Sequence, residues 1–221
     1  MTAEPTKNDL RPMTQGAETE PIFLIDTSGS MSWPAAEGSS INRESVVGEI
    51  LGRLVEELGA EDSQAEAEAA AGEDAGGVMT VLFSNPEDAE CIDDLSTANW
   101  KQKWGSIRWG GGTNIMPGWN LVVDGFLEEF GEKPKQDRPA MLCLVITDGE
   151  ADDADQFAQE ISKAQGGTYV CVAIVGFGAD HDNTLGAYQK IAAVNKHVRV
   201  VTFGGQTNPD EIANDLLQLL K

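Results

Sequence analysis

The chain has 221 residues, 41% of them apolar, which is enough for one domain with a substantial hydrophobic core. Its formal net charge of −22 argues against nucleic acid and anionic membranes as partners, because their phosphates would be repelled. The three cysteines, Cys91, Cys143 and Cys171, show no CxxC spacing, so we expect neither a disulfide framework nor a zinc site.

Residues 1–20 are polar and include Pro5 and Pro12, so we expect a mostly disordered arm followed by one domain over residues 21–221. This arm has no apolar segment of the kind that a signal peptide needs, and no apolar run in the chain is long enough to span a bilayer. We therefore expect a soluble, cytoplasmic protein.

Apolar runs then alternate with segments of helical spacing. Runs at 21–26, 78–84, 140–147, 168–175 and 198–203 predict strands, with a short strand near Cys91. Helices are predicted from 40 to 58, with Ser40 or Asn42 as the cap, from 96 through 104, from Pro117 through 127, and over 155–165, 185–194 and 209–220. Strands that are apolar throughout and alternate with helices predict an α/β fold, a parallel sheet covered by helices on both faces.

The acidic stretch 60–77 interrupts this alternation and is rich in Ala, Glu, Asp and Gly. We interpret it as an insertion that forms a solvated loop or helix extension. A surface for cations or for a basic partner is the alternative.

Polar side chains follow the first strand, where an apolar run ends abruptly in Asp26 and continues with Ser28 and Ser30. Ligands bind at the carboxyl ends of parallel strands. These three side chains offer only hard oxygen atoms, which suit Mg²⁺, Mn²⁺ or Ca²⁺ rather than zinc. Gly29 allows a tight turn in which the two hydroxyls can converge.

Two later segments supply further oxygen atoms. The glycine-rich loop from Gly110 to Asn114 contains Thr113, and the strand over 140–147 ends directly before Asp148. Chain geometry then brings Asp26, Thr113 and Asp148 to one edge of the sheet. We interpret the nearby acids, including Asp152 and Asp153, as solvated loop charges, with tuning of the metal or selection of partners as the alternative.

Together these segments resemble the metal-ion-dependent adhesion site of the von Willebrand factor type A (vWA) family. Its parts here are Asp26-Thr27-Ser28-Gly29-Ser30, then Gly112-Thr113-Asn114, then Thr147-Asp148-Gly149, in the order that the family shows. The resemblance covers nearly the whole chain after residue 20, and it implies a doubly wound sheet of about six strands. The absence of a signal peptide and of disulfides makes the chain look closer to intracellular, bacterial-type members.

The resemblance also implies a role for each matching residue. Ser28 and Ser30 would bind the metal directly, Thr113 would bind it when a ligand is present, and Asp26 and Asp148 would act mostly through water. Neutral hydroxyls leave Mg²⁺ electron-poor, so that it takes a carboxylate from outside as a remaining ligand. The expected function is a Mg²⁺-dependent interaction module that binds a Glu or Asp of a protein partner.

Two other kinds of protein remain as alternatives. One is a Mg²⁺-dependent hydrolase of the phosphatase type, although Ser28 stands where such an enzyme would want a second Asp. The other is a non-catalytic acidic protein that binds cations weakly. We expect no catalysis, because neither His181 nor His197 lies near the motifs and no base–nucleophile pair is evident.

The tryptophans allow two interpretations. We expect Trp100, Trp104, Trp109 and Trp119 to pack loops and helices onto the sheet, together with Trp33 after the first motif. An aromatic rim that contacts the partner is the alternative, because Trp is enriched at interface hot spots.

Overall fold

The computed structural model describes residues 9–14, 16–59, 77–149, 151–176 and 182–220. A central sheet has six strands in the order β3-β2-β1-β4-β5-β6. They are β1 (Thr19–Asp26), β2 (Val78–Phe83), β3 (Glu90–Leu95), β4 (Ala140–Thr147), β5 (Thr168–Ile174) and β6 (Val198–Thr202). Every neighbouring pair is parallel except β2 and β3, which are antiparallel. The predicted doubly wound, mainly parallel sheet is confirmed.

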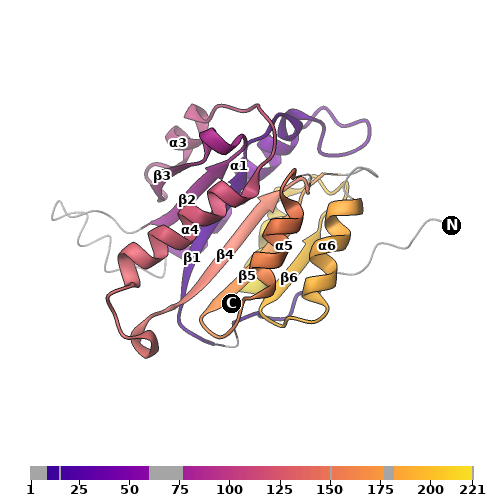
Figure 1. Ribbon diagram of the computed structural model, residues 1–221. Helices are drawn as coiled ribbons and strands as arrows, with labels where there is room; N and C mark the ends of the chain where they lie inside the picture. The colour runs from indigo at the N-terminus through magenta and orange to yellow at the C-terminus, as the bar shows by residue number, and fades with distance from the viewer. Residues whose placement is uncertain (1–8, 15, 60–76, 150, 177–181, 221) are drawn as a thin grey trace.

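Helices cover both faces of this sheet, as predicted (Figure 1). They are α1 (Arg43–Gly59), α3 (Trp100–Ser106), α4 (Ile115–Phe130), α5 (Ala154–Ser162), α6 (Asp182–Ala192) and α7 (Pro209–Leu220). Buried side chains of α1 and α7 pack on one face, and those of α4, α5 and α6 pack on the other.

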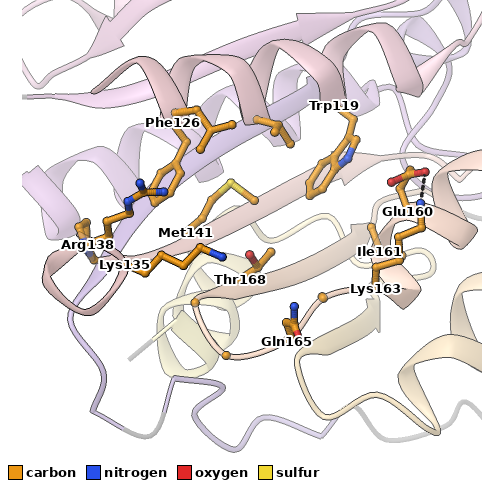
Figure 2. A pocket seen from close by; sticks show the side chains of 16 residues that line it. Trp119, Phe126, Lys135, Arg138, Met141, Glu160, Ile161, Lys163, Gln165 and Thr168 are labelled. Carbon is orange, nitrogen blue, oxygen red and sulfur yellow. Dashed lines mark hydrogen bonds and ion pairs between the residues drawn. The ribbon is translucent and has the colours of Figure 1, made fainter. Parts of the chain in front are cut away.

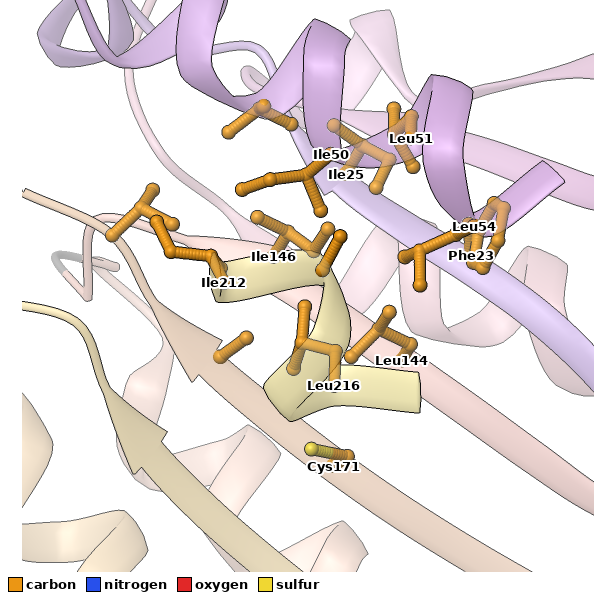
Figure 3. Close-up of a cluster of buried hydrophobic side chains, with 14 of the residues drawn as sticks. Phe23, Ile25, Ile50, Leu51, Leu54, Leu144, Ile146, Cys171, Ile212 and Leu216 are labelled. Atoms are coloured by element: carbon orange, nitrogen blue, oxygen red, sulfur yellow. The ribbon is translucent and has the colours of Figure 1, made fainter. Parts of the chain in front are cut away.

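The central strands are apolar throughout because they are buried on both faces. In β1, Phe23 and Ile25 point into the cluster under α1 and α7, whereas Ile22 and Leu24 point into the cluster under α4 and α5. All residues of β4 are buried. Figure 3 shows the first cluster, with strand side chains such as Leu144 between the two helices.

Two helix starts differ from the prediction by a few residues. Helix α4 begins at Ile115, two residues before Pro117. Proline is tolerated there because the N–H groups of the first helical turn have no acceptor within the helix, so the missing N–H of Pro117 costs no hydrogen bond. Helix α1 begins at Arg43, and the Asn42 side chain accepts a hydrogen bond from the Ser45 amide at 2.9 Å. Asn42 is therefore the capping residue rather than Ser40.

Part of the N-terminal segment packs on the domain. Met13 is only 3% exposed, and its amide donates to the Leu219 carbonyl of α7 at 2.9 Å. The first strand begins at Thr19 rather than at Pro21. Residues 1–8 and 15 of the predicted arm, and 60–76 of the predicted acidic insertion, lie outside the described residues, so these boundaries stay predictions.

Tryptophan packing agrees with the first interpretation at most positions. Trp100 and Trp104 of α3 lie against Gly52 and Gly48 of α1, where a Cβ atom would fall 2.5 and 2.4 Å from the two rings. Trp109 meets the edge of Trp104 with ring centres 5.0 Å apart. Trp33 is different, because it is 54% exposed.

No helix in the described ranges combines the length and the apolar character that are needed to cross a membrane.

Candidate metal centre

The candidate site lies at the carboxyl ends of β1 and β4, which are neighbours in the middle of the sheet. Asp26 is the last residue of β1, Thr147 is the last residue of β4, and Asp148 follows directly. Both Asp26 and Asp148 are completely buried. The two acids are therefore placed side by side by the sheet itself, as the sequence predicted.

Hydrogen bonds to Asp26 shape the loop that follows β1. One carboxylate oxygen accepts from the Ser28 amide at 2.8 Å, and the other accepts from the Thr147 hydroxyl at 2.7 Å. The chain folds back over Asp26, and a short 3₁₀ turn (Gly29–Ser32) follows. The Ser28 and Ser30 hydroxyl oxygens lie 3.2 Å apart. Three of the five predicted ligands thus form one continuous polar cluster.

Arg43, which the sequence did not single out, joins this cluster. Its guanidinium donates to the Asp148 carboxylate at 2.5 Å and to the Ser30 carbonyl at 3.3 Å. The Arg43 guanidinium also packs against Gly176. A Cβ atom added at Gly176 would lie 2.4 Å from Arg43 Nε. A basic residue in the first turn of a helix opposes the helix dipole, and this was the one available signal that Arg43 has a special partner.

The glycine-rich loop packs directly on the loop after β1. The Gly110 amide donates to the Thr27 carbonyl at 2.9 Å, and the Gly29 amide donates to the Gly111 carbonyl at 3.3 Å. Gly111 has a φ of +85°, and a Cβ atom there would lie 2.5 Å from the Asn85 side chain. The Asn85 side chain also accepts from the Gly112 amide at 2.8 Å. Close approach requires glycine in this loop, as predicted.

Thr113 lies at the same edge, half-buried, two residues before α4 begins at Ile115. Its carbonyl accepts from the Asp152 amide at 2.8 Å, which links the glycine-rich loop to the loop after β4. Within the described residues, Thr113 makes this hydrogen bond through its backbone and none through its hydroxyl. The structure therefore brings the Thr113 backbone to the site and leaves a side-chain role as a prediction.

Asp153 corrects one interpretation made from the sequence. It is not a solvated loop charge, because its carboxylate accepts from the Ile115 and Met116 amides at 2.8 and 2.9 Å. These are the first amides of α4, and the Asn114 side chain does not cap them. The first turn of α4, next to Thr113, is thus held by an acid from the neighbouring loop.

The electrostatics of the site favour a cation. Burial, and next the charge of Asp148, raise the pKa of the Asp26 carboxyl above its ordinary value, although hydrogen bonds from Ser28 and Thr147 oppose this rise. Both carboxylates are buried, and in the described part of the chain the ion pair of Arg43 reaches Asp148 rather than Asp26, so a cation beside Asp26 would be favourable.

The oxygen atoms of the five predicted residues fit a hard divalent ion. Within the described ranges, no three His, Cys, Asp or Glu side chains are grouped so that they could hold a metal ion. A metal at this edge of the sheet would therefore depend on the hydroxyl groups as well as on the acids.

The sequence matches no family model and no curated protein. Solved structures match the fold. An aerotolerance-related membrane protein from Bacteroides fragilis, with multiple mutations to serines, is 19% identical with a TM-score of 0.59, and the match covers 91% of this chain and 98% of that one. The VWA domain of SpRpn10 is 9% identical with a TM-score of 0.58, covering 93% and 98% of the two chains. The manganese-loaded TRAP protein of Plasmodium vivax is 15% identical with a TM-score of 0.55, covering 90% and 72%.

Proposed function

We propose that this chain, which has the von Willebrand factor type A fold, is a divalent-metal-dependent module that binds an acidic side chain of a protein partner. One observation carries the proposal. The Ser28 and Ser30 hydroxyls lie 3.2 Å apart beside the buried Asp26 carboxylate, at the carboxyl end of the central strands. Hydroxyls and carboxylates gathered in this way are the ligand chemistry of Mg²⁺ and Mn²⁺.

Each residue would have a separate task. Ser28, Ser30 and Thr113 would hold the metal through their hydroxyls. The buried Asp26 and Asp148 carboxylates would supply negative charge near the metal. The bound ion would supply a Lewis-acidic position for an external carboxylate. Asp26 orients the loop in any case, because its carboxylate holds the Ser28 amide and the Thr147 hydroxyl.

Charge balance supports an acidic ligand from a partner. Arg43 already pairs with Asp148, so part of the negative charge is neutralised before any metal binds. A divalent ion held largely by neutral hydroxyls keeps most of its positive charge. It can therefore attract a carboxylate even on a chain with a net charge of −22. The manganese-loaded TRAP protein, which has the same fold, is consistent with a metal at such a site.

The first experiment is calorimetric titration of Mg²⁺ and Mn²⁺ into metal-free protein. We expect one saturable site in the wild-type protein and its loss in Ser28→Ala and in Asp26→Ala. Ser32→Ala is the matched control, because this hydroxyl lies two residues beyond Ser30 and points to Glu44, with 3.4 Å between the oxygen atoms. Equal metal binding in wild type and Ser28→Ala would show that the motif is not the metal site.

The second experiment tests the acidic ligand. An array of immobilised peptides is probed in pairs that differ only by Glu or Gln at the central position, with Mg²⁺ or with a chelator. We expect binding to Glu peptides that requires Mg²⁺ and is lost in Ser28→Ala. Equal binding of the protein to the Gln peptides and to the Glu peptides would contradict a role for the carboxylate.

The proposed module is non-catalytic. His197 lies directly before β6 at the sheet edge, away from Asp26, and His181 lies outside the described residues. Release of phosphate from a generic phosphate ester that is lost in Asp26→Asn would instead support the hydrolase alternative.

A further inference from the structure

A cavity of about 390 Å³ lies at the other end of the sheet from the candidate metal centre. It opens between α4 and α5, beside Met141 and Thr168 at the amino ends of β4 and β5 (Figure 2). A volume of this size falls within the range of small-molecule sites. None of the described residues that line the cavity belongs to the site around Asp26.

The floor of this cavity is apolar and its rim is basic. Trp119 and Phe126 from α4, Met141 from β4 and Ile161 from α5 form the apolar surface. The basic side chains are Lys135, Arg138 and Lys163. The chain has 15 basic against 37 acidic residues, yet among the described residues that line the cavity Glu160 is the one acid. The cavity is thus a positively charged place on a strongly negative protein.

The three cations differ in how they are engaged. Lys163 pairs with Glu160 at 2.6 Å. Arg138 donates to the Lys133 carbonyl at 2.7 Å and to the Gly131 carbonyl, which orients its guanidinium without neutralising it. Lys135 extends across the cavity in Figure 2, and within the described ranges no carboxylate pairs with its amine.

We propose that this cavity binds a small organic anion, a carboxylate attached to an aromatic or branched aliphatic body. The body would lie on the floor between Phe126 and Trp119, and the carboxylate would face Lys135 and Arg138. Burial of an apolar body and a charge-assisted contact at its end are the two features that such sites combine. The proposal does not depend on metal binding at Asp26.

The test uses naphthoate as the probe and its neutral amide, naphthamide, as the matched ligand. Both are titrated into the full-length protein by calorimetry in the presence of a chelator, so that the carboxylate cannot bind to a metal. We expect one site for naphthoate with a dissociation constant below about 1 mM, and at least about tenfold weaker binding of naphthamide. Asp26→Ala should bind naphthoate as the wild type does.

Two variants locate the site. Lys135→Gln removes the cation that extends across the cavity, and Leu127→Asp places a negative charge at a lining position that is 47% exposed. We expect each to weaken naphthoate binding about tenfold or more. Lys133→Gln is the control, because Lys133 lies in the same connection but over the Phe130 ring, with its amine 4.8 Å from the ring centre.

Each outcome of these titrations either supports or overturns the proposal that the cavity binds an organic anion. Charge-dependent binding that Lys135→Gln and Leu127→Asp weaken and Lys133→Gln leaves unchanged supports the proposal. No binding, equal binding of naphthoate and naphthamide, or binding that is unchanged in Lys135→Gln and Leu127→Asp overturns it. Circular dichroism and thermal unfolding of each variant check that a loss of binding is not a loss of folding.

Discussion

The Arg43 guanidinium lies 2.5 Å from the Asp148 carboxylate, and the two side chains are only 4% and 0% exposed. The pair connects the start of α1 to the end of β4, and the same guanidinium reaches the Ser30 carbonyl in the loop after β1. A buried ion pair of this kind adds little net stability, but the loss of one partner leaves an uncompensated charge. Arg43 is therefore a built-in counter-ion of the candidate metal centre.

Replacing Arg43 should destabilise the metal-free protein and make it depend on metal. We expect Arg43→Met, which keeps much of the volume, to lower the free energy of unfolding by about 3–5 kcal/mol, because the buried Asp148 carboxylate loses its partner. On the metal-binding proposal, Mg²⁺ should restore more stability to this variant than to the wild type. Urea unfolding with Mg²⁺ and with chelator measures both effects.

Two outcomes of that experiment would count against this interpretation. Unchanged stability of Arg43→Met without metal would mean that the ion pair is not a structural support. An equal effect of Mg²⁺ on variant and wild type would mean that Arg43 and the metal do not balance the same charge. Arg53→Met is a suitable control, because Arg53 lies on the same helix and its ion pairs, with Glu56 at 3.3 Å and with Asp210 at 3.5 Å, are at the surface.

The sequence predicted the oxygen cluster because its signals are local. Asp26 and Asp148 each stand directly after an apolar run, and such runs mark the ends of buried strands. Neither Arg43 nor Asp153 stands directly after an apolar run. Their partners, Asp148 and the amide of Ile115, are 105 and 38 positions away in the sequence. Contacts of this kind depend on how the loops at the sheet edge come together, which no periodicity records.

Gly111→Ala should disturb the site through the backbone alone. The φ of +85° is unfavourable for alanine, and the new methyl group would fall 2.5 Å from the Asn85 side chain. We expect the free energy of unfolding to fall by about 1–3 kcal/mol and the affinity for Mg²⁺ to fall with it. Denaturant unfolding and calorimetry measure the two quantities.

Gly105→Ala controls for the change of residue type, since it lies in helix α3 with nothing within 4 Å of the added Cβ. It should leave the protein unchanged or slightly more stable. A Gly111→Ala variant as stable as Gly105→Ala would argue that the loop relaxes easily and is not held in one conformation.

Asp153→Ala should loosen the first turn of α4. The carboxylate accepts from two amides there, and the loss of such a cap costs about 1–2 kcal/mol. Hydrogen exchange should show faster exchange of the Ile115 and Met116 amides. Asp155→Ala is the control, because this exposed acid lies in the first turn of α5 and should change stability by less than about 0.5 kcal/mol. Equal protection of both amides in wild type and Asp153→Ala would contradict the cap.

Thiol chemistry should distinguish the three cysteines. Burial raises the pKa of the Cys171 thiol to about 12 and also raises that of the Cys143 thiol, while Cys91 on β3 is exposed. The thiolate is the reactive form, so at pH 8 only Cys91 should react with a chromogenic disulfide reagent. Cys91→Ser should then show no reaction until the protein is unfolded, after which both buried thiols are labelled. Reaction of a second thiol in the folded wild type would show that the sheet between α1 and α5 opens more readily than its packing implies.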